Sequence, residues 1–327
     1  MLNHDGFVRA GRRAGRSALL AASWGEGMRW RLAASVVCAL VAAALAAAQV
    51  LAAHRLGINE WTTAGGSYSE YIDWDHALTR STWYPVASTL VASAITYRVF
   101  RRMPWSWLWL PPVAWLGSCL TAAPLLYALA SATPEAGINS SPLEVAWATI
   151  IGGAIGVAAA MAALRDREIG VGLLAYTLWV SLLEFTWPWW WDRAPTFDPM
   201  LTEGTLSGKT GEYVVKATFI EAGGITAGLI GPVMVSGIIA AWAAAQHGRR
   251  NHGVQAGVAG PLLLFSVYVT IDPGLDNQDS IQATLWANSL LAVLIGLCVS
   301  LLTATVAQII AKQKQAGAFW FRTRIRL

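Results

Sequence analysis

The 327-residue chain has little charge and little cysteine. Only 13% of its residues are charged and three are cysteines, whereas 55% are apolar. This charged fraction is about half of that in soluble domains, and it excludes intrinsic disorder, which requires a polar and highly charged composition. Cys38, Cys119 and Cys298 all lie within apolar runs. We therefore expect buried free thiols, with no disulfide, no metal site and no bound cofactor, in a membrane protein.

The chain contains several long apolar runs. A membrane helix needs about 20 mostly apolar residues to cross about 30 Å of hydrocarbon. Eight runs qualify or nearly qualify: Trp30–Ala53, Tyr84–Phe100, Trp107–Ser131, Leu143–Leu164, Ile169–Trp190, Phe219–Gln246, Val254–Ile271 and Thr284–Ala311. These runs lack the period-two alternation of membrane β-strands. The predicted fold class is an all-α, polytopic membrane bundle of about eight transmembrane helices.

The basic residues divide unequally between the two sides of this bundle. The side that holds both termini and the loops after spans two, four and six carries 18 of the 23 basic residues and 4 of the 19 acidic ones. Short cytoplasmic connections are enriched in Lys and Arg, which places both termini in the cytoplasm. The Arg-rich, Lys-poor and Ala-rich composition is typical of a GC-rich bacterial genome, so we expect a bacterial plasma membrane. In this interpretation residues 1–29 form a basic amphipathic cytoplasmic segment and residues 312–327 a basic cytoplasmic tail.

The eight spans divide into two sets with the same loop pattern, residues 30–164 and residues 165–311. Each set has one long outer loop that contains the pattern Gly-x-x-x-Glu-Tyr, beginning at Gly66 in the first set and at Gly208 in the second. Because each set begins inside and has an even number of spans, a true duplication would be a parallel 4+4 repeat. Short matches between Ala- and Leu-rich helices also arise by chance, so the repeat is one of two open interpretations.

Glu184 is the only acidic residue well inside a predicted span. An ionisable group at that depth costs about 3 kcal/mol on insertion scales and usually faces the interior of a bundle or a wet cavity. We predict that Glu184 contacts a cation, a proton or a substrate. The alternative is that Glu184 lies near the outer interface and orders the bundle through a pair with His54, Arg55 or Arg193.

Other acidic residues gather on the predicted outer side. Asp73, Asp75 and His76 lie in the first long outer loop, and Glu221 begins the sixth span. Carboxylates and imidazole perform proton transfer or bind cations, so these residues are candidate site residues. The alternatives are a solvated acidic loop for the first three, and a helix N-terminus that favours negative charge for Glu221.

Glycine and proline occur where a moving or closely packed helix needs them. Small residues let helices approach closely, and proline frees a backbone carbonyl that must find another partner. Tight packing and a hinge are both compatible with this pattern. The residues concerned are Gly224, Gly228, Gly231, Pro232, Gly260 and Pro261.

The segment Gly204–Thr210 resembles a phosphate-binding loop, but it is one residue short and does not follow a predicted strand. We therefore expect no ATPase in this chain. The layout, a basic interfacial segment followed by spans with short inner loops, resembles the membrane subunit of some bacterial ATP-driven exporters. We predict a transporter permease or a membrane subunit of a transport system. Its partners would be the lipid bilayer and a separate cytoplasmic ATPase or other membrane subunit, with no nucleic acid. The alternatives are a membrane-embedded enzyme acting on a lipid-linked substrate at the outer face, and a non-catalytic assembly or sensing subunit.

Overall fold

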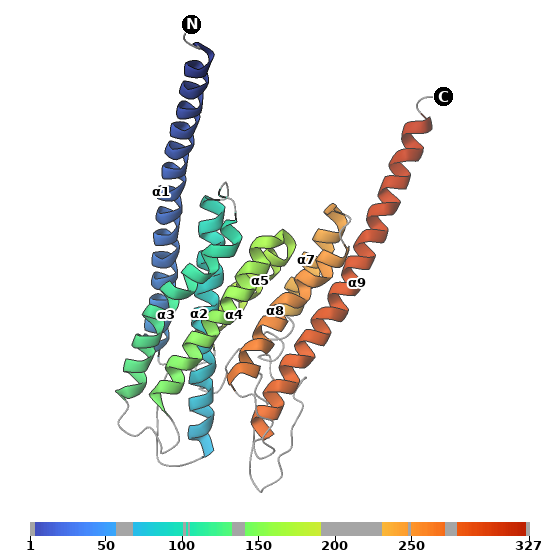
Figure 1. Cartoon of the computed structure of the whole chain (residues 1–327). Helices are drawn as coiled ribbons and strands as arrows, with labels where there is room; N and C mark the ends of the chain where they lie inside the picture. The colour runs from blue at the N-terminus through green and yellow to red at the C-terminus, as the bar shows by residue number, and fades with distance from the viewer. Residues whose placement is uncertain are drawn as a thin grey trace.

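A computed structural model describes residues 4–56, 68–100, 103, 105–132, 141–190, 231–247, 250–271 and 280–324. All regular structure in these residues is helical, with eight helices and no strand. The helices, labelled as in Figure 1, are α1 (His4–Arg55), α2 (Tyr68–Val99), α3 (Ser106–Ser131), α4 (Pro142–Arg165), α5 (Arg167–Trp190), α7 (Gly231–His247), α8 (Arg250–Ile271) and α9 (Ser280–Arg324). The all-α prediction is confirmed for the described part of the chain.

Five of these helices are long and apolar enough to cross a membrane. The qualifying segments are Met28–Arg55, Ser106–Ser131, Pro142–Arg165, Arg250–Thr270 and Leu290–Lys314. Each is longer than the roughly 20 residues that a bilayer core requires. These segments identify the chain as a helical membrane protein.

Many large apolar side chains lie on the outside of the bundle. Large side chains such as Leu40, Leu120 and Leu302 are more than 60% exposed, whereas the interior of α1 is a stripe of small residues that includes Ala34 and Ala42. Small interior residues let helix backbones approach closely, and large apolar side chains are compatible with a surface that faces lipid. This distribution is the one expected of helices that pack in a bilayer.

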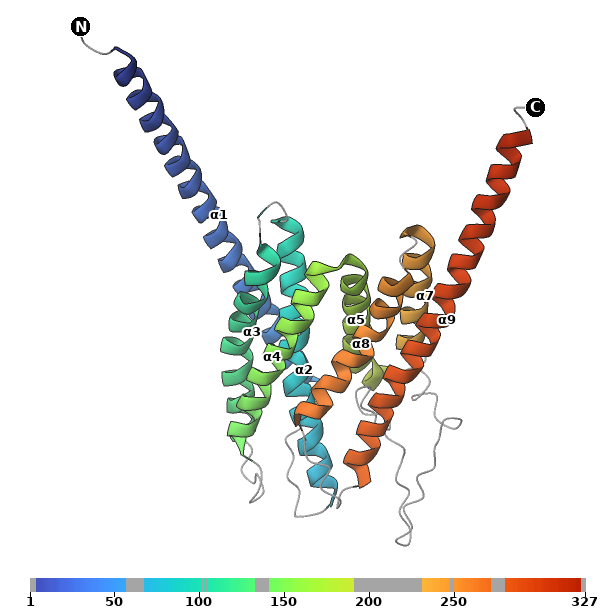
Figure 2. The same ribbon diagram turned by 45° about the vertical axis from the view of Figure 1, so that its right-hand side comes forward.

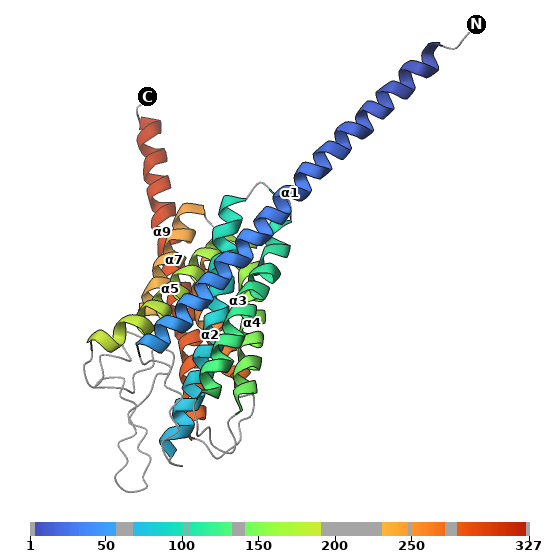
Figure 3. The same ribbon diagram turned by 90° about the vertical axis from the view of Figure 1, so that its left-hand side faces the viewer.

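Both termini lie at the same end of the bundle, which we call the terminus-bearing end (Figures 1 and 2). There α1 and α9 continue beyond the other helices and diverge from each other. At 1.5 Å per residue, α1 is about 78 Å long, more than twice the thickness of a bilayer core. Figure 3 shows that α1 continues as one helix, without a break at the predicted boundary between residues 29 and 30.

The eight helices of the described residues can be taken in chain order as two sets of four, and the same pairs are in contact within each set. In the first set α1 contacts α2 and α3, α2 contacts α3 and α4, and α3 contacts α4. In the second set α5 contacts α7 and α8, α7 contacts α8 and α9, and α8 contacts α9. Taken in chain order, these are the same five pairs. The two sets meet mainly through α2 and α4 of the first and α5 and α8 of the second.

Helix α2 begins much earlier than the hydropathy predicts. The predicted second span starts at Tyr84, whereas α2 starts at Tyr68 and is 32 residues long. The predicted long outer loop is therefore wrong for residues 68–83, which are helical. Their polar side chains lowered the hydropathy, but a helix satisfies its own backbone hydrogen bonds and can continue past the apolar core.

Several helix contacts depend on glycine. A Cβ atom added to Gly152 of α4 would lie 2.1 Å from the carbonyl oxygen of Thr82 in α2. A Cβ atom added to Gly117 of α3 would lie 2.3 Å from the carbonyl oxygen of Ala39 in α1. The neighbouring atoms are backbone atoms, which cannot turn aside as a flexible side chain does. These helices can therefore approach so closely only because the residues are glycine.

Candidate functional site

A buried polar cluster lies where the first set of helices meets the second. Its centre is Glu184 of α5, whose side chain is almost completely buried. The hydroxyl of Tyr84 in α2 donates a hydrogen bond of 2.8 Å to Glu184 Oε1. Arg80 Nε, also in α2, lies 3.8 Å from the same oxygen. A carboxylate from α5 thus contacts a guanidinium and a phenol from α2, at the boundary between the two sets of helices.

Helix periodicity explains how these side chains meet. Residues three and four apart lie on the same face of a helix, so Arg80, Trp83 and Tyr84 all point from α2 toward its neighbours. On α5, Ser181 and Glu184 are also three apart, and Trp83 Nε1 donates a 3.4 Å hydrogen bond to Ser181 Oγ. We call these five residues the α2–α5 cluster.

The α2–α5 cluster lies toward the end of the bundle opposite the termini. At 1.5 Å per residue, Glu184 is about 26 Å along α5 from Arg167 and about 9 Å from Trp190. Arg80 is about 28 Å along α2 from Val99, so the two charged groups lie at nearly the same level. The cluster is therefore closer to the end of the bundle opposite the termini than to the terminus-bearing end.

Aromatic side chains surround this cluster. The rings of Tyr84 and Phe185 stack with their centroids 6.5 Å apart. Tyr176 of α5 and Tyr268 of α8 are both buried in the same core. Water therefore screens the attraction between Arg80 and Glu184 only weakly. Removal of either side chain would leave the charge of the other in an apolar environment.

The structure shows a partner of Glu184 that the sequence did not suggest. The expected partners were His54, Arg55 and Arg193, but His54 and Arg55 are exposed, and Arg193 lies outside the described residues. The base beside Glu184 is Arg80, which the sequence placed in an outer loop. A usable signal was present, because Arg80 and Tyr84 are four residues apart, as are residues on one helical face.

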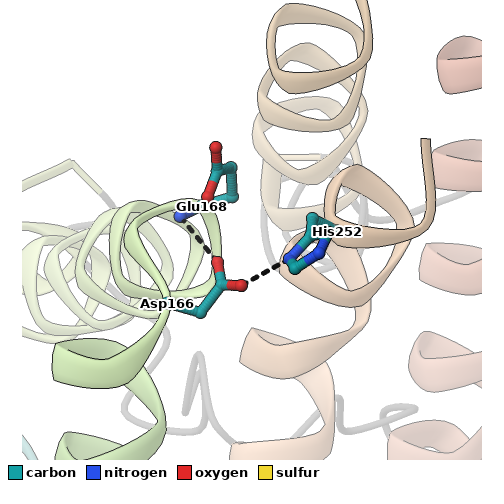
Figure 4. Close-up of side chains that lie close together, drawn as sticks. All are labelled: Asp166, Glu168 and His252. Carbon is teal, nitrogen blue, oxygen red and sulfur yellow. Dashed lines mark hydrogen bonds and ion pairs between the residues drawn. The ribbon is translucent and has the colours of Figure 1, made fainter. Parts of the chain in front are cut away.

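A second polar cluster lies at the terminus-bearing end, where α4 passes into α5 through Asp166. One carboxylate oxygen, Oδ1, accepts hydrogen bonds from the backbone N–H groups of Glu168 (3.0 Å) and Ile169 (3.2 Å). Asp166 therefore caps the start of α5, a position at which Asp is strongly favoured. The other oxygen, Oδ2, pairs with Nδ1 of His252 in the first turn of α8 (Figure 4). This pair joins the α4–α5 turn to α8.

The two residues beside Asp166 bind opposite sets of helices. The guanidinium of Arg165 lies over the ring of Trp107 in α3, 6.0 Å from its centroid. The guanidinium of Arg167 lies over the ring of Trp242 in α7, at 5.7 Å. Such cation–π contacts are worth about 0.5–1 kcal/mol at exposed sites. The turn is thus attached to α3 of the first set and to α7 and α8 of the second.

Asp166, Glu168 and His252 are the described residues best placed to hold a metal ion. Each offers one ligand atom, and these atoms lie within 4.8 Å of one another. Both oxygens of Asp166 are already engaged, however, and the Glu168 carboxylate lies beside the Asp166–His252 pair (Figure 4). Helices α5 and α8 both begin here, and helix N-termini favour negative groups. Capping and ion pairing therefore account for the two carboxylates.

The hydrogen bonds to Asp166 determine its acidity. Burial alone would raise the pKa of the Asp166 carboxyl, but the hydrogen bond from Ile169 N–H and the hydrogen bond and charge of His252 outweigh it. The pKa of Asp166 is therefore below its ordinary value. A carboxylate with a depressed pKa in the folded state stabilises the fold above its unfolded pKa, and this contribution is lost as the pH falls through the folded pKa.

Acidification should consequently weaken the α4–α5–α8 junction through Asp166. We expect the melting temperature of the wild type to fall as the pH drops from about 5 toward 3, because Asp becomes protonated in this range and below. Asp166→Asn should melt lower than the wild type at pH 7 and show a flatter dependence over the same interval. Differential scanning fluorimetry in detergent measures both curves. Glu144→Gln, which changes an exposed carboxylate, is the control, and parallel curves for the wild type and Asp166→Asn would contradict the assignment.

Most of the other predicted site residues have side chains outside the part of the chain that the structure describes. Asp73, Asp75 and His76 belong to α2, and the backbone there is helical, but their side chains lie outside the described residues. Glu221, Gly224 and Gly228 lie outside the described residues altogether.

The predicted hinge and packing residues belong to α7 and α8. Gly231 and Pro232 are the first described residues of α7, and their side chains are not described. A Cβ atom on Gly260 would lie 2.4 Å from the ring of Tyr176, and a Cβ atom on Gly296 of α9 would lie 3.3 Å from Cγ of Pro261. For Gly260 and Pro261 the structure thus shows close packing between helices.

Comparison of the chain with protein-family models, with curated proteins and with solved structures finds no match. The function must therefore be argued from the residues themselves.

Proposed function

We propose that the chain is a transporter permease, or a membrane subunit of a transport system, in a bacterial plasma membrane with both termini in the cytoplasm. The observation that carries this proposal is the contact of Glu184 with Arg80 and Tyr84 at the boundary between the two sets of helices. Ionisable residues within membrane bundles are costly, and they usually mark a substrate or ion pathway. Transporters commonly place this pathway between two sets of helices.

Two further observations support the proposal. The same five helix pairs contact each other in each set, as expected if the 4+4 parallel repeat is real. Exposed Arg98, Lys312 and Lys314 lie toward the terminus-bearing end, together with the Arg165 and Arg167 turn. An excess of basic residues at one end of the bundle is typical of the cytoplasmic side. Because the chain has no recognisable ATPase motif, a separate cytoplasmic ATPase would supply any ATP-driven step.

The transport proposal can be tested without knowing the substrate. In the native host, a deletion strain would be compared with strains that carry the wild type, Glu184→Gln or Glu144→Gln on the chromosome. Mass spectrometry of small molecules inside and outside the cells should show at least one compound that the deletion redistributes. Glu184→Gln should resemble the deletion, because it removes the charge that pairs with Arg80, and Glu144→Gln should resemble the wild type.

Protein levels must be matched by immunoblot, so that loss of transport is distinguished from loss of protein. If neither the deletion nor Glu184→Gln redistributes any compound, and purification of the native protein recovers no ATPase, the transport proposal is wrong.

A further inference from the structure

Helix α2 presents three hydrogen-bond donors to α5 within little more than one turn. Arg80, Trp83 and Tyr84 carry a guanidinium, an indole N–H and a phenol hydroxyl. Tyr84 donates to Glu184 Oε1 at 2.8 Å, Trp83 donates to Ser181 Oγ at 3.4 Å, and Arg80 Nε lies 3.8 Å from Glu184 Oε1. Glu184 and Ser181, the partners in these three contacts, both belong to α5.

This set of donors has the chemistry of an anion site. A guanidinium and a hydroxyl side by side are groups that proteins use to bind carboxylates, because hydrogen bonds to a charged partner are the strong ones. In the structure the Glu184 carboxylate occupies the position of the anion. We propose that the α2–α5 cluster is a binding site for a carboxylate-bearing substrate, which replaces the Glu184 carboxylate on Arg80 and Tyr84. This inference rests on the proposed transport function.

The exchange keeps the buried charge balanced. The Arg80 side chain is 13% exposed and that of Glu184 is 1% exposed, so neither charge can rely on water. If the incoming carboxylate pairs with Arg80 while Glu184 takes up a proton and becomes neutral, one positive and one negative charge remain in the cluster, and neither the guanidinium nor the displaced carboxylate is buried as an unpaired charge, which would be strongly unfavourable.

The position of the cluster indicates the side of entry. Glu184 is about 9 Å along α5 from Trp190, but about 26 Å from the terminus-bearing end of the helix. The shorter route to the cluster therefore begins at the end opposite the termini. A substrate carboxylate would arrive from that side, which is the outer side in the proposed orientation.

Chemical rescue tests this assignment. Glu184→Ala removes the internal carboxylate from the full-length protein, which is then purified in detergent and melted with and without sodium acetate. We expect Glu184→Ala to melt below the wild type, and acetate to restore at least half of the lost melting temperature. Acetamide, the uncharged isostere, and sodium chloride at equal ionic strength should restore little. Leu182→Ala, a truncation of an exposed neighbour on α5, should show no difference between acetate and acetamide.

The rescue must depend on Arg80. In the double variant Arg80→Gln/Glu184→Ala, the acetate concentration needed for half of the effect should rise by about tenfold or more, which corresponds to loss of about 1.4 kcal/mol of binding. Equal rescue by acetate and acetamide, or undiminished rescue in the double variant, would overturn the proposal. If Glu184→Ala cannot be purified alone, acetate present throughout purification should recover monodisperse protein from Glu184→Ala and not from the double variant.

Lipid is the other source of such an anion. Glu184→Ala is therefore also reconstituted in nanodiscs of phosphatidylcholine, with or without phosphatidylglycerol. Rescue by acetate in phosphatidylcholine alone supports a soluble carboxylate, whereas stabilisation by phosphatidylglycerol without acetate would overturn that assignment. Because rescue is measured without transport, its success beside a failed transport test would leave an anion site in a protein of another function.

Discussion

Replacing Glu184 with leucine is expected to lower the free energy of unfolding by about 3–5 kcal/mol. The substitution leaves the Arg80 guanidinium, 13% exposed, without its carboxylate inside the bundle. Removing one partner of a buried ion pair is strongly destabilising for this reason, whereas replacing both partners by apolar residues is often neutral. The double variant Arg80→Met/Glu184→Leu should therefore be more stable than Glu184→Leu alone.

A denaturant titration in mixed micelles measures these free energies, and the wild type, Arg80→Met, Glu184→Leu and the double variant form a double-mutant cycle. The interaction energy between residues in contact usually lies between about 0.5 and 3 kcal/mol. Leu182→Ala removes apolar volume from the exposed face of the same helix and is the control. A cost below about 1 kcal/mol for Glu184→Leu would show that Arg80 and Glu184 do not depend on each other.

Replacing Gly152 with leucine is expected to separate α2 from α4. A Cβ atom at this position would lie 2.1 Å from the Thr82 carbonyl oxygen, and the remaining leucine atoms would need more space still. Overpacking a core costs about 1–3 kcal/mol when side chains can adjust. Here the obstacle is backbone, so we expect a loss at the upper end of this range or beyond it, with a lower yield of monodisperse protein.

Size-exclusion chromatography and the same titration measure the effect of Gly152→Leu. Gly152→Ala adds the Cβ atom alone and should lie between the wild type and Gly152→Leu. Ala154→Leu provides a matched control, because Ala154 is exposed on the other face of α4. If Gly152→Leu is as stable as Ala154→Leu, the close approach of α2 and α4 is wrong.

The apolar runs predicted the centres of the helices better than their ends. The predicted run Leu143–Leu164 is one residue shorter than α4 at each end, and Trp107–Ser131 is one residue shorter than α3 at its start. The prediction was wrong at the start of α2. Hydropathy detects only the apolar part of a helix, whereas α2 begins at Tyr68 and includes polar residues before that part. The eight-span topology and the 4+4 repeat stay predictions.

The candidate site was predictable only in part. Glu184 could be singled out because an acidic residue inside an apolar run is conspicuous. Arg80 could not be assigned to it, because the two residues are 104 positions apart and a single sequence does not show which helices touch. The pair of Asp166 with His252 was missed for the same reason, although the position of Asp166 just before a helix is typical of a cap.

The one-residue connection at Asp166 has a mechanical consequence. It is the only covalent link between the two sets of helices, and it holds the adjoining ends of α4 and α5 together at the terminus-bearing end. Any rigid rotation of one set against the other must therefore pivot near Asp166, with the largest displacement at the far end. A tilt of about 10° moves a point 26 Å from the pivot by about 4–5 Å. Such a tilt exceeds what the 2.8 Å hydrogen bond between Tyr84 and Glu184 can follow, so the α2–α5 cluster would separate.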